Sequence, residues 1–341
     1  MLNIIIPTYN RPYQLSLCLI SVMRNIKILD SKNLTQVRVV VRNNSTKFFE
    51  ENSRVEKYAR YFFENYGVKF EFIRTGVDIG SGQNCTTSYL DTLSGYIWLL
   101  PDDDIMGYGS LNSVINLTKD SLYSVLIATP NNVQRIPYSF PRTSINKPSD
   151  YYEYSVQELF DFDALKSTGL VEAQNYVFSA EVVSKYFRLN VQKCEIDEYS
   201  PLLMLLLATY LRKPYVIFSK SIGIFRADDP NSEWRHRWLR WCSVEFYNVL
   251  KCWNSIGLIT HNQKELLKYG FFSSFSDNWF RVDILFNFWN PRFPFFWELI
   301  ALYRKKYFDM VFFIFKNPLK LIKAIRLKLT EKKYQRINDN S

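Results

Sequence analysis

Histidine, cysteine and long apolar runs are scarce in this sequence, and each scarcity excludes a class of protein. Of the 341 residues, two are histidines and five are cysteines. Two histidines exclude a histidine metal cluster. The cysteines are odd in number, widely spaced and without a Cys-x-x-Cys pair, so they suggest neither a disulfide framework nor a zinc site. A reducing, cytoplasmic compartment fits this usage best.

No segment has the length of a membrane span. The longest purely apolar runs, such as residues 202–208 and 310–315, are far shorter than the roughly 18 residues that a spanning helix requires. Met1-Leu2-Asn3 leads directly into a strand-like segment, with no basic region and no small-residue cleavage site. The sequence therefore predicts no transmembrane helix and no signal peptide.

What the chain has in abundance is apolar surface and, near its end, positive charge. Apolar residues make up 47% and aromatic residues 17% of the chain, which is enough to form a large core and excludes general disorder. The formal net charge is +10. Residues 304–336 hold eleven Lys or Arg against Asp309 and Glu331, so this stretch alone carries +9. Such a block attracts nucleic acid or an anionic membrane.

Hydrophobic patterning predicts an α/β unit over residues 1–230 and a helical, aromatic and basic region over residues 231–341. In the first unit, short β-branched runs alternate with helical patterns, as in a parallel sheet. Expected strands cover residues 2–6, 37–41, 69–74, 95–100, 125–129 and 214–219. Expected helices follow the first two strands and cover residues 111–117, and residues 131–149 are expected to form a long loop.

The sharpest chemical motif is the acidic triplet Asp102-Asp103-Asp104, which follows Pro101 and an apolar strand. Adjacent carboxylates repel one another, so a cation or hydrogen-bond donors must offset their charge in a folded protein. Mg²⁺ or Mn²⁺ bridging a diphosphate meets this need with one or two carboxylates. The alternative is a solvated acidic turn.

Several further motifs stand in a fixed order before this triplet. They are Ile-Ile-Ile-Pro-Thr-Tyr-Asn-Arg at residues 4–11, Val-Val-Val-Arg-Asn-Asn-Ser-Thr at residues 39–46, and Asp78-Ile79-Gly80 with Asn84. Together with the triplet they resemble the inverting family-two glycosyltransferases. Within this family the chain looks most similar to transferases of O-antigen and capsular polysaccharide, such as abequosyltransferase-like enzymes. The resemblance covers residues 1–230 and is strongest up to residue 118.

The resemblance implies a GT-A fold, which is a Rossmann-like nucleotide-binding unit with a mixed, mainly parallel sheet, here followed by a helical C-terminal extension. It implies a nucleotide diphosphate sugar as donor and Mg²⁺ or Mn²⁺ as cofactor, with Asp103 and Asp104 as metal ligands. The residues that it implies for donor binding are Pro7, Thr8, Tyr9, Arg11, Asn43, Asp78, Gly80, Asn84, Asp102, Asp104 and Arg226.

One position departs from the family's pattern. The family usually has an aspartate just after the second strand, where it contacts the donor base, and here Arg42 occupies that position. A guanidinium cannot accept the hydrogen bonds that a carboxylate accepts. Either Asn43 replaces the aspartate or the base is not uracil, and a non-catalytic relative that binds nucleotide sugars, or serves in assembly, is the alternative function.

An inverting transfer also requires a general base for the acceptor hydroxyl. The resemblance places it at a helix start some eighty to a hundred residues after the triplet, where Asp197 and Glu198 stand before an apolar run. Glu198 aligns slightly better than Asp197. Acidic residues are also favoured at a helix N-terminus by the helix dipole alone, which is the alternative interpretation.

The C-terminal region predicts a membrane contact. In residues 319–329, Lys320, Lys323 and Arg326 fall broadly opposite apolar residues, which is the pattern of a basic amphipathic helix. The alternative is a helix packed on the main domain. We expect a peripheral protein at the inner face of the plasma membrane that uses a polyprenyl-diphosphate-linked glycan as acceptor. No nucleic-acid-binding module is recognisable, so no nucleic acid partner is expected.

Overall fold

The computed structural model describes residues 1–119, 125–128, 151–154, 176–189, 204, 215–218, 224–226 and 246–265. The chain divides into two compact units, Met1–Pro230 and Asn231–Ser341. The expected loop at residues 131–149 and the basic helix at residues 319–329 lie outside the described residues.

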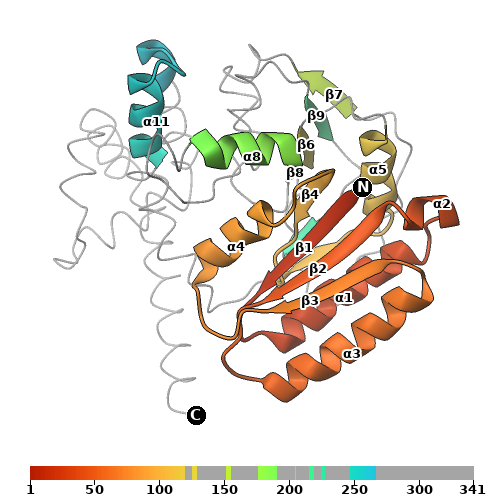
Figure 1. The fold of residues 1–341 in the computed structure, drawn as a ribbon. Coiled ribbons are helices and arrows are strands. Elements are labelled where there is room, and N and C mark those ends of the chain that lie inside the picture. Colours follow the sequence, from red (N-terminus) through yellow and green to blue (C-terminus); the bar gives the residue numbers. More distant parts are fainter. Residues whose placement is uncertain are drawn as a thin grey trace, which may run out of the picture. The chain divides into compact units, whose positions relative to one another are not determined.

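Four parallel strands form the first half of the sheet in the Met1–Pro230 unit (Figure 1). They are β1 (Leu2–Thr8), β2 (Val37–Asn43), β3 (Lys69–Arg74) and β4 (Tyr96–Leu99), in the spatial order β3-β2-β1-β4. The helices of this half are α1 (Pro12–Ile26), α2 (Ser31–Leu34), α3 (Phe49–Asn65) and α4 (Ser81–Leu90). Helices connect β1 to β2, β2 to β3 and β3 to β4, as parallel strands require a crossover and not a tight hairpin.

The second half of the sheet mixes directions. Its strands are β6 (Val125–Ala128), β7 (Tyr151–Tyr154), β8 (Tyr176–Ser179) and β9 (Tyr215–Phe218), and the eight strands have the order β3-β2-β1-β4-β8-β6-β9-β7. β8 is antiparallel to both of its neighbours, β4 and β6, while β6 and β9 are parallel. A two-stranded antiparallel ribbon joins β5 (Asp104–Met106) to β10 (Ile224–Arg226). The remaining helices are α5 (Ser110–Thr118), α8 (Ala180–Leu189) and, in the second unit, α11 (Phe246–Ser255).

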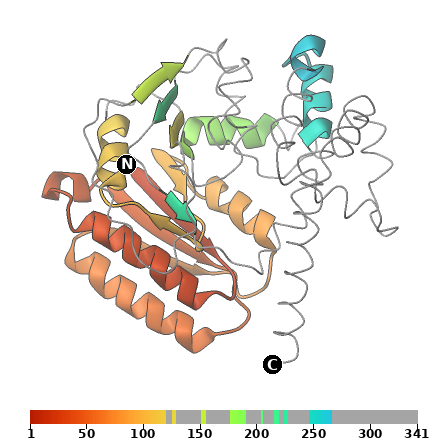
Figure 2. The ribbon, with the colours of Figure 1, turned by 180° about the vertical axis from the view of Figure 1, so that it is seen from behind.

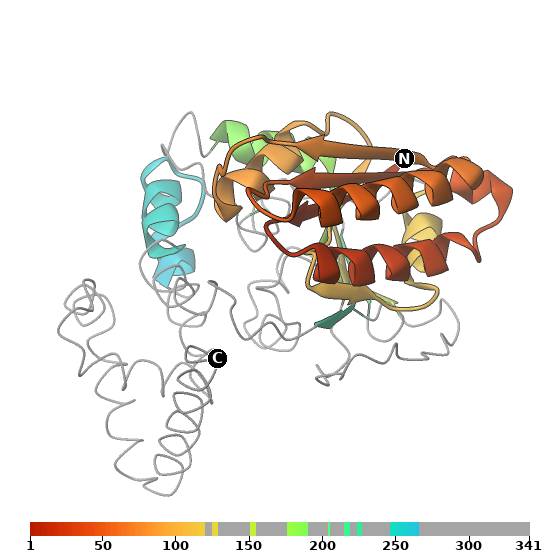
Figure 3. The same cartoon turned by 90° about the horizontal axis from the view of Figure 1, so that it is seen from below.

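The core follows from side-chain alternation along the strands. Val37, Val39 and Val41 of β2 are buried on the face that α1 and α3 cover, together with apolar residues of β1 and α1. Figures 2 and 3 show α1 and α3 lying side by side across this face. Pro12 opens α1, where the missing N–H costs nothing because the first helical N–H groups have no intrahelical partner. α4 contacts β1 and α8.

The structure confirms most expected elements and corrects some details. The strands at residues 2–6, 37–41, 69–74, 95–100, 125–129 and 214–219 and the helix at 111–117 are all present, with ends shifted by a few residues. In α3 the buried aromatic is Phe63, whereas Tyr58 is 61% exposed. Cys252 is disulfide-bonded, although the number and spacing of the cysteines suggested no disulfide framework. Spacing did not indicate this bond because pairing depends on spatial proximity.

Candidate active site

The candidate site lies where the four parallel strands end. The loops that follow β1, β2, β3 and β4 cover residues 9–11, 44–48, 75–80 and 100–103 and lie at the same edge of the sheet. Open α/β sheets bind their ligands at this edge, because strand ends and helix starts expose polar backbone groups there. Five of the eleven residues expected to bind the donor come from these loops, namely Tyr9, Arg11, Asp78, Gly80 and Asp102.

Thr8 and Asp102 form the innermost contact of the site. Thr8 Oγ1 donates a hydrogen bond of 2.6 Å to Asp102 Oδ2. Burial raises the pKa of Asp102 to about 7 and the neighbouring Asp103 carboxylate adds to this, while the Arg11 guanidinium, the Thr8 hydroxyl and the Tyr9 N–H oppose it. Asp102 is 3% exposed and Asp104 2%. The alternative of a solvated acidic turn is therefore wrong for these two residues.

Arg11 supplies a positive charge to the acidic triplet. Its Nη1 atom lies 3.2 Å from Asp103 Oδ2 and 3.5 Å from Asp102 Oδ1. The arginine side chain is 31% exposed, more than either carboxylate. A single guanidinium nitrogen thus faces two carboxylates from the solvent side.

Asp104 begins β5, and α1 holds this strand in place. Ser21 Oγ accepts a hydrogen bond of 2.9 Å from Met106 N, and Asn25 Nδ2 donates one of 2.9 Å to the Gly107 carbonyl. The ribbon register places Asp104 opposite Arg226 of β10. The two positions, 122 residues apart in sequence, are neighbours because of this short ribbon. The sequence motif indicated both residues but not their pairing.

A second group of polar residues joins the loops after β2 and β3. Asp78 Oδ1 accepts hydrogen bonds of 2.8 Å from Asn44 Nδ2 and from Gly80 N. Asn44 Oδ1 accepts one of 2.9 Å from Ile79 N. The Gly80 N–H, together with the Tyr9 and Asn44 side chains, lowers the pKa of Asp78 below its usual value. Tyr9, which is 38% exposed, and Asp78 thus lie together at the site's outer edge.

Sequence reasoning missed two residues that organise these loops, Asn44 and Asn10. Asn10 has a φ of 53°, and its Oδ1 accepts hydrogen bonds from Thr46 N at 3.0 Å and Lys47 N at 2.9 Å. Its own N–H donates to Ser45 Oγ at 2.8 Å. The residue type could have indicated their role, because asparagine is among the few residues that adopt left-handed backbone easily and form hydrogen bonds with nearby backbone groups.

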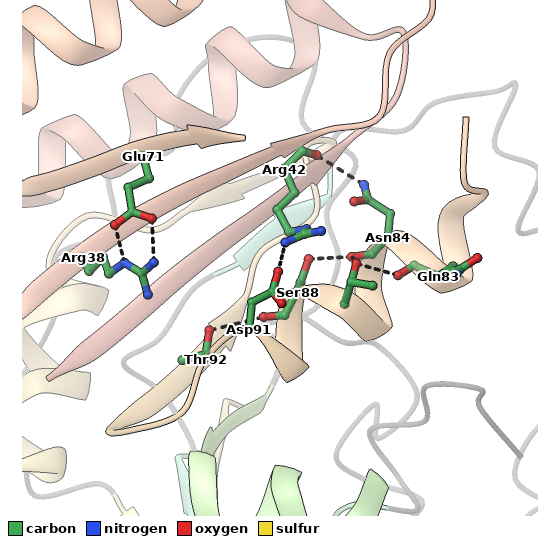
Figure 4. A network of polar contacts seen from close by, with 9 residues as sticks. Arg38, Arg42, Glu71, Gln83, Asn84, Ser88, Asp91 and Thr92 are labelled. Carbon is green, nitrogen blue, oxygen red and sulfur yellow. Dashed lines mark hydrogen bonds and ion pairs between the residues drawn. The ribbon is translucent and has the colours of Figure 1, made fainter. Parts of the chain in front are cut away.

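Arg42 points under α4 and not toward the loops of the site (Figure 4). Its guanidinium is ion-paired with Asp91 at the end of α4, and its carbonyl accepts a hydrogen bond of 3.2 Å from Asn84 Nδ2. Arg42 is 7% exposed and Asn84 3%. Both residues therefore tie α4 to β2, which accounts for an arginine at this position. Asn43 is also occupied locally, since its Oδ1 accepts a hydrogen bond of 2.8 Å from Ser45 N.

The structure describes the remaining predicted site residues only in part. Pro7 lies in β1 opposite Arg42. Of Arg226 only the backbone is described, and the predicted bases Asp197 and Glu198 lie outside the described residues. Their roles stay predictions.

The carboxylate groups of the acidic triplet are suitable ligands for a divalent ion such as Mg²⁺ or Mn²⁺. Asp102 Oδ1 and Asp103 Oδ2 already converge on one cationic nitrogen, and carboxylate oxygens are the ligands that these ions prefer. Within the described part of the chain, no group of three or more His, Cys, Asp or Glu side chains is arranged to hold a metal alone. The protein would thus supply one or two ligands and a bound diphosphate the others, as is usual for Mg²⁺ at phosphate sites.

Among the described residues, no helix is both long enough and apolar enough to cross a membrane.

Comparison with known proteins identifies the fold. No protein-family model and no curated protein sequence matches the chain. The crystal structure of S. aureus TarS 1–349 in complex with UDP-GlcNAc is similar, with a TM-score of 0.51 and 14% identity over 80% of this chain and 72% of that chain. For the same fragment in complex with UDP, the TM-score is 0.50 and the identity 15% over 80% and 70%. The chain has the GT-A fold, with a mixed and mostly parallel sheet.

Proposed function

We propose that the chain is a glycosyltransferase that uses a nucleotide diphosphate sugar as donor. The observation that carries the proposal is the cluster of Thr8, Arg11, Asp102 and Asp103 at the carboxyl edge of a GT-A sheet. This cluster combines carboxylates for a divalent ion with a guanidinium for phosphate oxygens. The TarS structures of similar fold contain UDP-GlcNAc and UDP, which supports a donor of this class.

In the proposed donor complex, each part of the site has one task. Tyr9 and Asp78 bind the nucleoside, because an exposed ring and an anchored carboxylate lie together there. Arg11 pairs with the diphosphate, and Asp103 and Asp104 hold Mg²⁺ or Mn²⁺. When bound, such an ion offsets the negative charge that develops on the departing nucleotide diphosphate. Glu198 or Asp197 accepts the proton of the attacking hydroxyl, and the attack inverts the anomeric centre.

The proposed acceptor is a polyprenyl-diphosphate-linked oligosaccharide, and the transferred sugar is a hexose or deoxyhexose of an O-antigen or capsule. This acceptor resides in the bilayer, so the enzyme must stay at the membrane. The basic amphipathic stretch at residues 319–329 supplies apolar side chains and lysines for an anionic surface. We propose a cytoplasmic location at the inner face of the plasma membrane.

Release of nucleotide diphosphate tests this function against the non-catalytic alternative. The full chain is incubated with a panel of nucleotide diphosphate sugars and Mn²⁺, and slow donor hydrolysis is measured. We expect release with at least one donor, loss of release in EDTA, and loss in Asp103→Ala. Glu50→Ala, which removes an exposed carboxylate from α3, is the control and keeps activity. Donor binding without any release, with every donor tested, would instead support a binding protein.

A further inference from the structure

The position of Arg11 is set by its neighbours on both sides. Asn10 is anchored in left-handed backbone by Thr46 and Lys47, and Pro12 starts α1. The Arg11 carbonyl accepts the first hydrogen bond of α1, from Leu15 N at 3.0 Å. The backbone of this arginine is therefore held in place, and its side chain reaches the end of β4 from a defined direction.

The same guanidinium nitrogen contacts Asp103, which is one of the two proposed metal ligands. Nη1 is 3.2 Å from Asp103 Oδ2 and 3.5 Å from Asp102 Oδ1. A Mg²⁺ ion binds carboxylate oxygens at about 2.1 Å. An ion bound to Asp103 Oδ2 would thus come within a few ångströms of Nη1, where two positive charges repel strongly. Arg11 in this position therefore opposes the binding of a metal ion at Asp103.

A diphosphate removes this conflict. The guanidinium fork pairs with phosphate oxygens as well as with carboxylates, and the Arg11 side chain is 31% exposed, so a ligand at the sheet edge can reach it from solvent. We propose that Arg11 is the internal counter-cation of Asp102 and Asp103 in the donor-free protein and moves to the donor diphosphate when metal and donor bind together. Metal ions alone then bind weakly. This inference rests on the proposed function. It adds that the metal ion and the nucleotide bind to the site together.

Binding of Mn²⁺ alone tests the inference without any turnover. Free Mn²⁺ is measured by electron paramagnetic resonance during titration of the full chain at about pH 8, where carboxyl groups are ionised. We expect Arg11→Met to bind Mn²⁺ at least about tenfold more tightly than the unaltered protein, since it removes a repelling charge. Arg54→Met removes an equally charged but 80% exposed side chain on α3 and should leave Mn²⁺ affinity unchanged.

Arg11→Lys separates the two roles of the side chain. It keeps the positive charge and should bind Mn²⁺ alone as weakly as the unaltered protein, but it lacks the fork and should bind UDP with Mn²⁺ less tightly. If Arg11→Met is not folded by circular dichroism, Arg11→Gln replaces it. Equal Mn²⁺ affinity in the neutral variant and the unaltered protein overturns the inference. Failure of every nucleotide diphosphate to bind overturns the proposed function instead, and the Mn²⁺ comparison still decides whether Arg11 competes for the carboxylates.

Discussion

Thr8 Oγ1 and Asp102 Oδ2 lie 2.6 Å apart and join the end of the first strand to the acidic turn after the fourth. Because β1 and β4 are adjacent parallel strands, this bond fixes the acidic turn relative to the strand end that leads into Tyr9 and Arg11. The contact thereby couples the carboxylates to the loop expected to bind the nucleotide.

Replacing Thr8 with valine should cost about 1–3 kcal/mol of unfolding free energy, because it removes a hydrogen-bond donor from a buried carboxyl group while preserving side-chain shape. Urea denaturation measures this loss. Thr8→Ser keeps the hydroxyl and should retain most of the stability. If valine and serine are equally tolerated, the bond to Asp102 does not contribute to stability.

Replacing Glu198 with glutamine should lower kcat at least about a hundredfold with little change in donor affinity, because the amide keeps the shape but cannot accept a proton. Steady-state kinetics and nucleotide binding give the two quantities. Asp197→Asn is the matched comparison and should retain activity. The opposite ranking would assign the base to Asp197, and two active variants would exclude this helix start.

Removing residues 318–341 should release the protein from vesicles of anionic lipid while sparing donor hydrolysis. Each lysine or arginine near such a surface contributes about 1 kcal/mol, and this term weakens with salt. Sedimentation with anionic and neutral vesicles, at low and high salt, measures the binding. Equal binding to both vesicle types, or unfolding after truncation, would favour a helix packed on the protein.

Protonation of Glu71 should lower the stability of the protein in acid. Arg38 binds its carboxylate with two hydrogen bonds, of 3.0 Å and 2.7 Å, and these lower the pKa of Glu71 from its usual value of 4.5. A carboxyl group with a lowered folded pKa contributes stability above its unfolded pKa, and this contribution is lost as pH falls through the folded value. Stability curves measured from neutral pH to below about pH 4 should therefore be flatter for Glu71→Gln. Glu64→Gln, on exposed α3 surface, should leave the curve unchanged.

Gly95 should not tolerate alanine. Its φ is 79°, and a Cβ atom would lie 2.2 Å from the Met1 carbonyl oxygen, which accepts the Tyr96 N–H. We expect a loss of more than about 2 kcal/mol in unfolding free energy from strain and clash together. Gly67→Ala shares the positive φ but meets no atom within 4 Å, so it isolates the strain and should cost about 1 kcal/mol. Similar losses in both variants would show that the clash is relieved by local movement.

Periodicity in the sequence predicted the elements whose pattern is local. β2 carries valine at positions 37, 39, 40 and 41, and α1 carries Leu15, Leu19 and Val22 at helical spacing, all of them buried. α4 was not predicted, because its sequence Ser-Gly-Gln-Asn-Cys-Thr-Thr-Ser-Tyr-Leu is polar and its place on the sheet depends on Asn84 and on the Arg42–Asp91 ion pair. β8 was not predicted either, since four residues give little pattern and its partners are distant in sequence.

The same distinction applies to the site. Asp102, Asp103, Thr8 and Arg11 were recognised from residue type and order, and the structure brings these four together. The sequence around Arg42 could not show that this side chain turns toward α4, because its partner Asp91 lies 49 residues away. Nor could the local sequence show that Asn10 and Asn44 hold the loops, since their side chains bond backbone groups of other loops.

The strand order also dictates a sequence of assembly during synthesis. β1 to β4 come from the first 99 residues and can pair as soon as these residues have emerged. β6 follows next along the chain, but β8 separates it from β4 in the sheet. β6 therefore cannot join the sheet until residues 176–179, which form β8, have left the ribosome. The chain therefore completes the four-stranded parallel half of the sheet before the strand that links it to the remainder has been made.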